Sequence, residues 1–240
     1  KLIPEDAWFF ATFRPGQIHE KMDYNAFVHM PAIAFSYSTN SLFESVDPED
    51  QDELDLAVYL TRIIEDPSES GIDLGEDCFF FAGPASKPNG EKFMPPMPSF
   101  GFVFALSDRG KFENMVELML EASRENDEVR RTSRNDLRLI KHEHWILAIS
   151  HNTAFFRGSP TKNSLVTDEV VKSLESPHEL DPDLAKHLSN PFDAGIYMEM
   201  KGYFDWIMLM IGDQVDFPGE LIEQMKEGIF TYEITGEDGQ

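Results

Sequence analysis

The fold of this chain is decided by the apolar run Phe100-Gly-Phe-Val-Phe-Ala-Leu106, which leads through the polar turn Ser107-Asp-Arg-Gly110 into an amphipathic stretch, residues 111–120. The run is short, aromatic and apolar throughout, as is typical of a buried strand. In the following stretch, apolar side chains recur at the spacing of one helix face. The sequence therefore predicts a strand that is followed directly by a helix.

The same order of strand, turn and helix recurs near both ends of the chain. Residues 8–13 and 195–200 are also apolar runs followed by helix-like sequence. The expected strand ends Phe13, Leu106 and Met200 are 93 and 94 residues apart. Such regular spacing indicates a repeated strand-helix unit, and we expect these three residues to occupy equivalent strand ends.

The composition describes a folded, strongly acidic protein. The chain has 240 residues, 41% of them hydrophobic, and its 44 acidic against 20 basic residues give a formal net charge of -24. A chain of this length and hydrophobicity can bury a sizeable core. Because nucleic acids and anionic membrane surfaces are bound through basic patches, the charge argues against both as partners. The simplest explanation of the excess acid is solubility.

The single cysteine, Cys78, lies in the sequence Asp77-Cys-Phe-Phe-Phe81 and excludes a disulfide within the chain. Its aromatic neighbours predict a small core residue rather than a reactive thiol. No apolar stretch reaches the ~18 residues that a membrane span requires. The chain starts at Lys1 without a Met, which suggests a leader or signal segment removed upstream.

Residues 47–66 predict a helix with a strong start signal. Asp47 can act as the N-cap and Pro48 suits the first helical position, with acids in the first turn. The acidic cluster of residues 47–55 lacks the Gly and the terminal Glu of a calcium-binding EF-hand loop. Helix capping is therefore the better explanation of these acids.

The second half of the chain predicts a β-meander followed by a boundary. Residues 137–142, 145–150 and 153–157 read as successive antiparallel strands, whereas residues 159–190 are polar and punctuated by prolines. We predict an α+β protein, mainly an antiparallel sheet with helices packed against it and built from repeated strand-helix units. Residues 1–158 would form a first region with two such units and the meander. Residues 159–240 would add helices and the third unit, packed on the same body.

Two short segments of the sequence resemble segments of a known protein family. They are Ile3-Pro-Glu-Asp-Ala7 before an apolar strand, and Asp66-Pro67 with Ser70-Gly-Ile-Asp73 before the aromatic strand at residues 79–81. With the strand pair at residues 145–156, the chain resembles a family of bacterial cell-envelope lipoproteins known only as a domain of unknown function. The resemblance implies a periplasmic or extracellular location, with a lipid anchor on a segment absent from this chain. It implies no activity.

A loop rich in proline carries apolar side chains. Residues 87–98 include Asn89-Gly90 and several prolines, which favour a loop over a central strand. Phe93, Met94 and Met97 are unusual in a solvated loop. They either pack back on the body or form a docking patch for a protein or small-molecule partner.

The best candidate for chemistry is His142-Glu-His144. On a strand, side chains two residues apart point the same way, so His142 and His144 could hold a metal ion together. A third ligand would come from His151, Glu143 or a distant acid. Solvated histidines at a strand end are the alternative.

No motif for a catalytic nucleophile, a nucleotide or another cofactor is present, and carboxylates are too numerous to single out an acid-base pair. We therefore expect a secreted or envelope-associated binding or structural module without catalysis and without a cofactor. The alternative is a metal-dependent hydrolase that uses His142 and His144.

Overall fold

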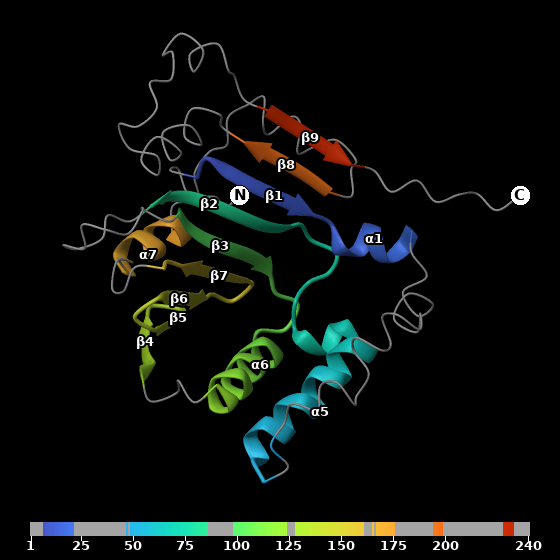
Figure 1. Cartoon of the computed structure of the whole chain (residues 1–240), viewed down its shortest axis with the longest axis vertical. Helices are drawn as coiled ribbons and strands as arrows, with labels where there is room; N and C mark the ends of the chain where they lie inside the picture. The colour runs from blue at the N-terminus through green and yellow to red at the C-terminus, as the bar shows by residue number, and fades with distance from the viewer. Residues whose placement is uncertain are drawn as a thin grey trace, which may run out of the picture.

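The computed structural model describes residues 7–21, 47, 49–85, 98–123, 128–160, 165, 167–175, 194–198 and 228–232. Within them, one antiparallel sheet has the strand order β4-β5-β6-β7-β3-β2-β1-β8-β9. Figure 1 shows this sheet from β9 at the top to β4 at the bottom, with α5 and α6 below it and α7 beside β7 and β6. The predicted α+β class is confirmed.

The strands alternate in direction across the sheet, and every neighbouring pair is antiparallel. The meander predicted from the sequence is present as β5, β6 and β7, and the first predicted strand is central because β1 lies between β2 and β8. In chain order, the strands are β1 (Phe9–Phe13), β2 (Cys78–Ala85), β3 (Pro98–Ala105), β4 (Arg130–Arg134), β5 (Leu137–Lys141), β6 (Trp145–Ile149), β7 (Thr153–Gly158), β8 (Ala194–Met198) and β9 (Gly228–Tyr232).

The first two predicted strand-helix units are present. β1 is followed by α1 (Pro15–Lys21), and β3 is followed by α6 (Arg109–Ala122) after the bridge residue Leu106. β1 and β3 run in the same direction with β2 between them. The third strand, β8, pairs antiparallel with β1. Met200 and the helix expected after it lie outside the described residues.

Helix α5 (Gln51–Glu65) confirms the predicted helix but begins later than expected. Asp50, rather than Asp47, is the N-cap, because its side chain accepts hydrogen bonds from the backbone N–H groups of Asp52 and Glu53. The Asp47 carboxylate instead accepts from the backbone of Glu49, one turn earlier. The helix is followed by the short 3-10 turn η1 (Pro67–Ser70).

The core lies on both faces of the sheet. On one face, buried side chains of the strands pack with Val170 and Val171 of α7 (Thr167–Glu175). On the other, Phe112, Val116 and Leu120 of α6 pack on β5, β6 and β7. We call these the α7 face and the α6 face. Helix α5 contacts α6 and is the outer layer there.

The later part of the chain joins the sheet formed by the earlier part. β8 pairs with β1, and β9 pairs with β8, so strands from both predicted regions share one sheet. The boundary proposed at residues 159–190 stays a prediction. None of the described helices has the length and apolar character that crossing a membrane requires.

Candidate functional site

The predicted histidine pair lies in the turn that joins β5 to β6. Backbone hydrogen bonds fix this turn: the N–H of His142 donates to the carbonyl of Trp145 at 2.9 Å, and the N–H of Ser159 donates to the carbonyl of His144 at 2.8 Å. The turn is therefore held both by its own hairpin and by the end of β7. The backbone that carries the His142 and His144 side chains is therefore fixed by hydrogen bonds.

His142 is buried, and its two ring nitrogens have different partners. Its Nδ1 accepts the backbone N–H of His144 at 3.3 Å, and its Nε2 lies 3.3 Å from an Oε2 of Glu128. Since a neutral imidazole has a single N–H, accepting at Nδ1 places the proton on Nε2, which donates to Glu128. The ring also stacks on Trp145, with centroids 5.6 Å apart. His142 is thus a packed hydrogen-bond donor.

His144 is half-buried, and the roles of its two ring nitrogens are the reverse of those in His142. Its Nδ1 lies 3.2 Å from the carbonyl oxygen of Ser159, and its Nε2 lies 3.5 Å from an Oε1 of Glu143. A carbonyl oxygen only accepts, so Nδ1 carries the proton and the neutral ring has its lone pair on Nε2. The Glu143 carboxylate therefore faces a nitrogen that can bind a proton or a metal ion.

The structure brings together part of the predicted ligand set. Glu128, His142 and Glu143 each offer a ligand atom, and these atoms lie within 4.8 Å of one another. Glu128, which is distant in sequence, enters this group from the segment just before β4, whereas His144 is not part of the group. His151 is exposed in the turn after β6, at the other end of that strand, and does not join the group.

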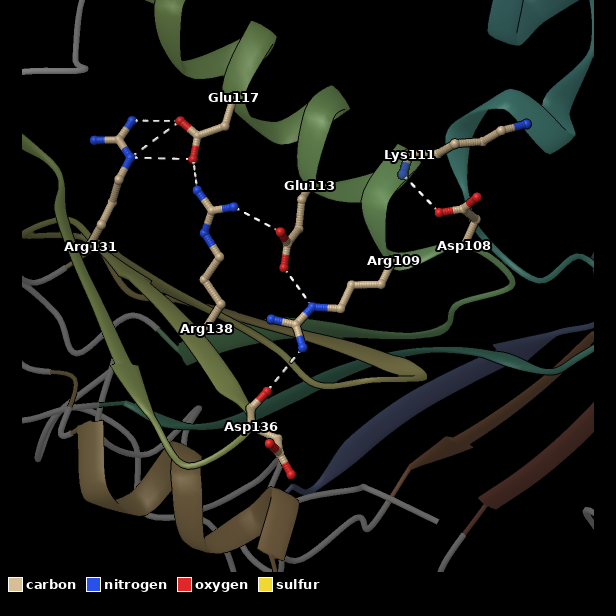
Figure 2. A network of polar contacts seen from close by, with 8 residues as sticks. All are labelled: Asp108, Arg109, Lys111, Glu113, Glu117, Arg131, Asp136 and Arg138. Carbon is tan, nitrogen blue, oxygen red and sulfur yellow. Dashed lines mark hydrogen bonds and ion pairs between the residues drawn. The ribbon is translucent and has the colours of Figure 1, made fainter.

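A second polar site ties α6 to the β4–β5 hairpin and was missed by the sequence analysis. Figure 2 shows that the carboxylates of Glu113 and Glu117 on α6 lie between three guanidinium groups, those of Arg131 and Arg138 of the hairpin and Arg109 of α6. Glu113 pairs with Arg109 at 2.6 Å and with Arg138 at 2.9 Å. Glu117 pairs with Arg131 at 2.8 Å and also with Arg138. The spacing of 109, 113 and 117, which puts all three on one helix face, is the signal that could have indicated it.

The electrostatics of this ion network favour the charged forms. Partial burial opposes ionisation of Glu113, but the hydrogen bonds from Arg109 and Arg138 outweigh it and hold the pKa of that carboxyl below its ordinary value. The hydrogen bond to Glu117 raises the pKa of Arg131 further above its already high value. Arg109 also donates to the backbone carbonyl of Asp136 at 3.0 Å, closing the network onto the hairpin turn. The network is a structural attachment of α6.

A third feature is a continuous set of aromatic rings on the α6 face. Phe80 lies 5.9 Å from Phe9 and 5.0 Å from Phe102, measured between ring centroids, and Phe102 lies 6.2 Å from Phe156. Strand register places all of them on the same side of β1, β2, β3 and β7. Helix α6 packs over the end near Phe156. We call the partly exposed rings the aromatic face: Phe9, Phe13, Phe80, Phe100, Phe102, Phe104 and Phe156.

Two further predictions concerned Cys78 and the apolar residues of the proline-rich loop. Cys78 is buried at the start of β2, and burial raises the pKa of its thiol to about 11, as expected for an inert core cysteine. Phe93, Met94 and Met97, the predicted docking residues, lie outside the described residues. Their role stays a prediction.

Comparison with known proteins shows only a distant likeness. Neither a protein-family model nor a curated protein sequence matches the chain. Among solved structures, crystal form I of TP0453 aligns with 13% sequence identity and a TM-score of 0.41, over 85% of this chain and 63% of that chain. Crystal form III of TP0453 aligns with 13% identity and a TM-score of 0.44, over 90% of this chain and 69% of that chain. A likeness this weak carries no functional argument.

Proposed function

We propose that this protein is a secreted or envelope-associated binding module without catalysis, and that it binds a partner protein through the aromatic face. The observation that supports the proposal is the connected set of rings from Phe9 through Phe156 to the exposed Phe100. The exposed Phe13 lies on the same side of the sheet. Surface aromatic residues that touch one another are typical of interaction sites rather than of ordinary solvated surface.

The charge of the chain indicates the chemistry of the partner. With a net charge of -24, the protein attracts cations over a long range and repels anions. A segment that combines apolar side chains with Lys and Arg would gain both from burying the rings and from this attraction. We therefore propose a basic amphipathic segment of another protein as the ligand, and neither a nucleic acid nor an anionic membrane surface.

The test uses two dye-labelled peptides with the same apolar residues, one carrying lysines and the other carrying glutamates. Fluorescence anisotropy should show saturable binding of the basic peptide and none of the acidic one. Phe100→Ser should weaken binding about tenfold, because an interface aromatic residue commonly contributes more than ~1 kcal/mol. Val58→Ser is the matched control: Val58 is 43% exposed, close to the 39% of Phe100, but lies on α5 away from the aromatic face.

Two results would contradict the proposal. If Val58→Ser weakens binding as much as Phe100→Ser, the peptide does not recognise the aromatic face. If the acidic peptide binds as well as the basic one, the charge argument fails. The proposed location has its own test, which is fractionation of cells that make the native full-length protein, with the envelope or the medium as the expected fraction.

The alternative prediction, a metal-dependent hydrolase, has one favourable observation, the lone pair that His144 presents to Glu143. Hydrolysis would also require a substrate position beside the metal. Assay of the zinc-loaded protein on chromogenic carboxylic and phosphoric esters tests it. Turnover that His144→Gln abolishes would replace the binding module as the main proposal.

A further inference from the structure

The turn between β5 and β6 holds two acceptor groups against each other. The proton on Nδ1 of His144 is committed to the carbonyl of Ser159, so the neutral ring turns a bare Nε2 toward a carboxylate oxygen of Glu143 at 3.5 Å. Two lone pairs in contact repel each other, and a metal ion bound between them would remove this repulsion.

We propose that His144 and Glu143 bind a zinc-class divalent metal ion. Zinc takes imidazole nitrogen and carboxylate oxygen at about 2.0–2.2 Å in tetrahedral geometry, which places two ligands about 3.4 Å apart. The separation of Nε2 and Oε1 matches this spacing. The hydrogen bond from Nδ1 to a backbone carbonyl is also the usual arrangement of a metal-binding histidine, because it fixes the ring and its tautomer.

Glu128 supplies the third ligand. One of its carboxylate oxygens lies within 4.8 Å of one from Glu143, in a group that includes His142 and not His144. Glu128 would therefore reach an ion at His144 by a change of rotamer, which its 68% exposed side chain has room to make. Glu128 already has a partner that points it at the turn, namely the Nε2–H of His142. The fourth position of a tetrahedral site is left for water.

His142 is then a positioning residue and not a ligand. Its Nδ1 accepts from the backbone of His144, so the proton stays on Nε2, and a metal at Nε2 would have to displace it. The histidine pair predicted from the sequence thus divides into one ligand, His144, and one residue that holds Glu128. The ion would connect the turn to the segment before β4, and the site is distinct from the proposed binding surface.

Isothermal titration of the metal-free protein with Zn²⁺ tests the site. We expect one saturating equivalent. His144→Gln and Glu143→Gln should weaken binding more than about 100-fold, and Glu128→Gln at least about 10-fold. His142→Phe keeps a ring against Trp145 but removes both hydrogen bonds, and it should weaken binding about 10-fold, the lower end for outer-shell residues. His144→Gln retains the backbone N–H that His142 accepts, so the turn keeps its hydrogen bond.

Two controls separate this site from general cation binding by an acidic surface. His151→Gln removes an exposed imidazole from the other end of β6 and should leave zinc affinity unchanged. Ca²⁺ at matched ionic strength should give no saturating heat that depends on His144. Zinc binding equal in His144→Gln and the parent would overturn the proposal. An equal loss in His151→Gln would overturn it too, as adventitious surface binding.

Discussion

Each face of the sheet has a phenylalanine ring that packs over a glycine of the neighbouring strand, but the two rings differ in burial. On the α7 face, the ring of Phe81 lies over Gly101 of the neighbouring strand, where an added Cβ would be 2.2 Å from the ring. On the α6 face, the ring of Phe100 lies over Gly158 in the same way, at 2.6 Å. Phe81 is fully buried, whereas Phe100 is 39% exposed. The Phe81–Gly101 pair is therefore part of the core, whereas the Phe100–Gly158 pair lies at the surface.

The difference shows that strand pairing and burial are separate properties of a sheet. A glycine opposite a phenylalanine lets the ring lie flat across the neighbouring strand, and this depends only on register. Whether the ring then stabilises the fold depends on what covers it. Phe81 packs against the buried Phe155 in the cluster that includes α7, while Phe100 contacts the partly exposed Phe156. The same motif can thus contribute to stability or to binding.

The largest expected effect comes from removing the buried ring. Phe81→Ala should lower the free energy of unfolding by about 3–5 kcal/mol, because it leaves a cavity in the core. Phe100→Ala should cost about 1 kcal/mol, since much of its ring is already in water. Urea titrations of both variants measure the difference. Equal losses of unfolding free energy in the two variants would mean that the Phe81 and Phe100 rings contribute equally to stability, which contradicts the comparison.

The same two contacts can be tested by enlarging the glycine instead of removing the ring. Gly101→Ala should cost about 1–3 kcal/mol by overpacking, because the new methyl group would meet the immobile Phe81 ring and also the backbone oxygen of Phe156 at 2.4 Å. Gly158→Ala should cost less, since the exposed Phe100 ring is its nearest contact and can swing outward. The same variant should also weaken binding of the basic peptide, because it displaces Phe100. A larger loss of stability at Gly158 than at Gly101 would contradict the comparison.

The sequence predicted the strands whose apolar residues are buried and missed the one whose residues are exposed. β4, Arg-Arg-Thr-Ser-Arg, is exposed throughout at the edge of the sheet, so no apolar pattern marks it. Its signal was the turn Asn135-Asp136, in which Asn135 has a positive φ of 53°. The direction of β8 could not be predicted, because a strand of apolar residues has the same pattern whichever way it runs.

The sequence pointed to the histidine pair but could not give its hydrogen bonds. The spacing of His142 and His144 indicated an imidazole pair, but hydrogen bonds to the backbone of His144 and of Ser159 decide which nitrogen carries a proton. Ser159 lies fifteen residues from His144. Glu128 is likewise brought to the turn by strand pairing and not by proximity in sequence. Such contacts depend on the register of β4, β5 and β7.

The ion network extends the comparison from single residues to charge, because Arg138 acts through ion pairs on the α6 face whereas Phe81 acts through apolar contacts on the α7 face. Arg138→Gln removes the residue that joins Glu113 to Glu117 and should cost about 1 kcal/mol at low ionic strength, and less as salt is added. The cost of Phe81→Ala should change little over the same range. Unfolding midpoints of both variants and the parent at low and physiological ionic strength measure this. A cost of Arg138→Gln that does not change with salt would show that the side chain acts mainly through packing.

The smallest expected effect is the pH dependence of Glu113. Its pKa is lower in the folded protein than the ordinary 4.5, so the ionised carboxylate stabilises the fold. This stabilisation is fully present above pH ~4.5, and it is lost as the pH falls through the lower pKa of the folded state. The parent should therefore exceed Glu113→Gln in stability by well under about 1 kcal/mol near neutral pH, and the gap should close in acid. Glu76→Gln, in an exposed turn outside the network, is the control for the loss of one carboxylate. A gap between the parent and Glu113→Gln that stays constant from pH 3 to pH 6 would mean that the charge of Glu113 does not stabilise the fold.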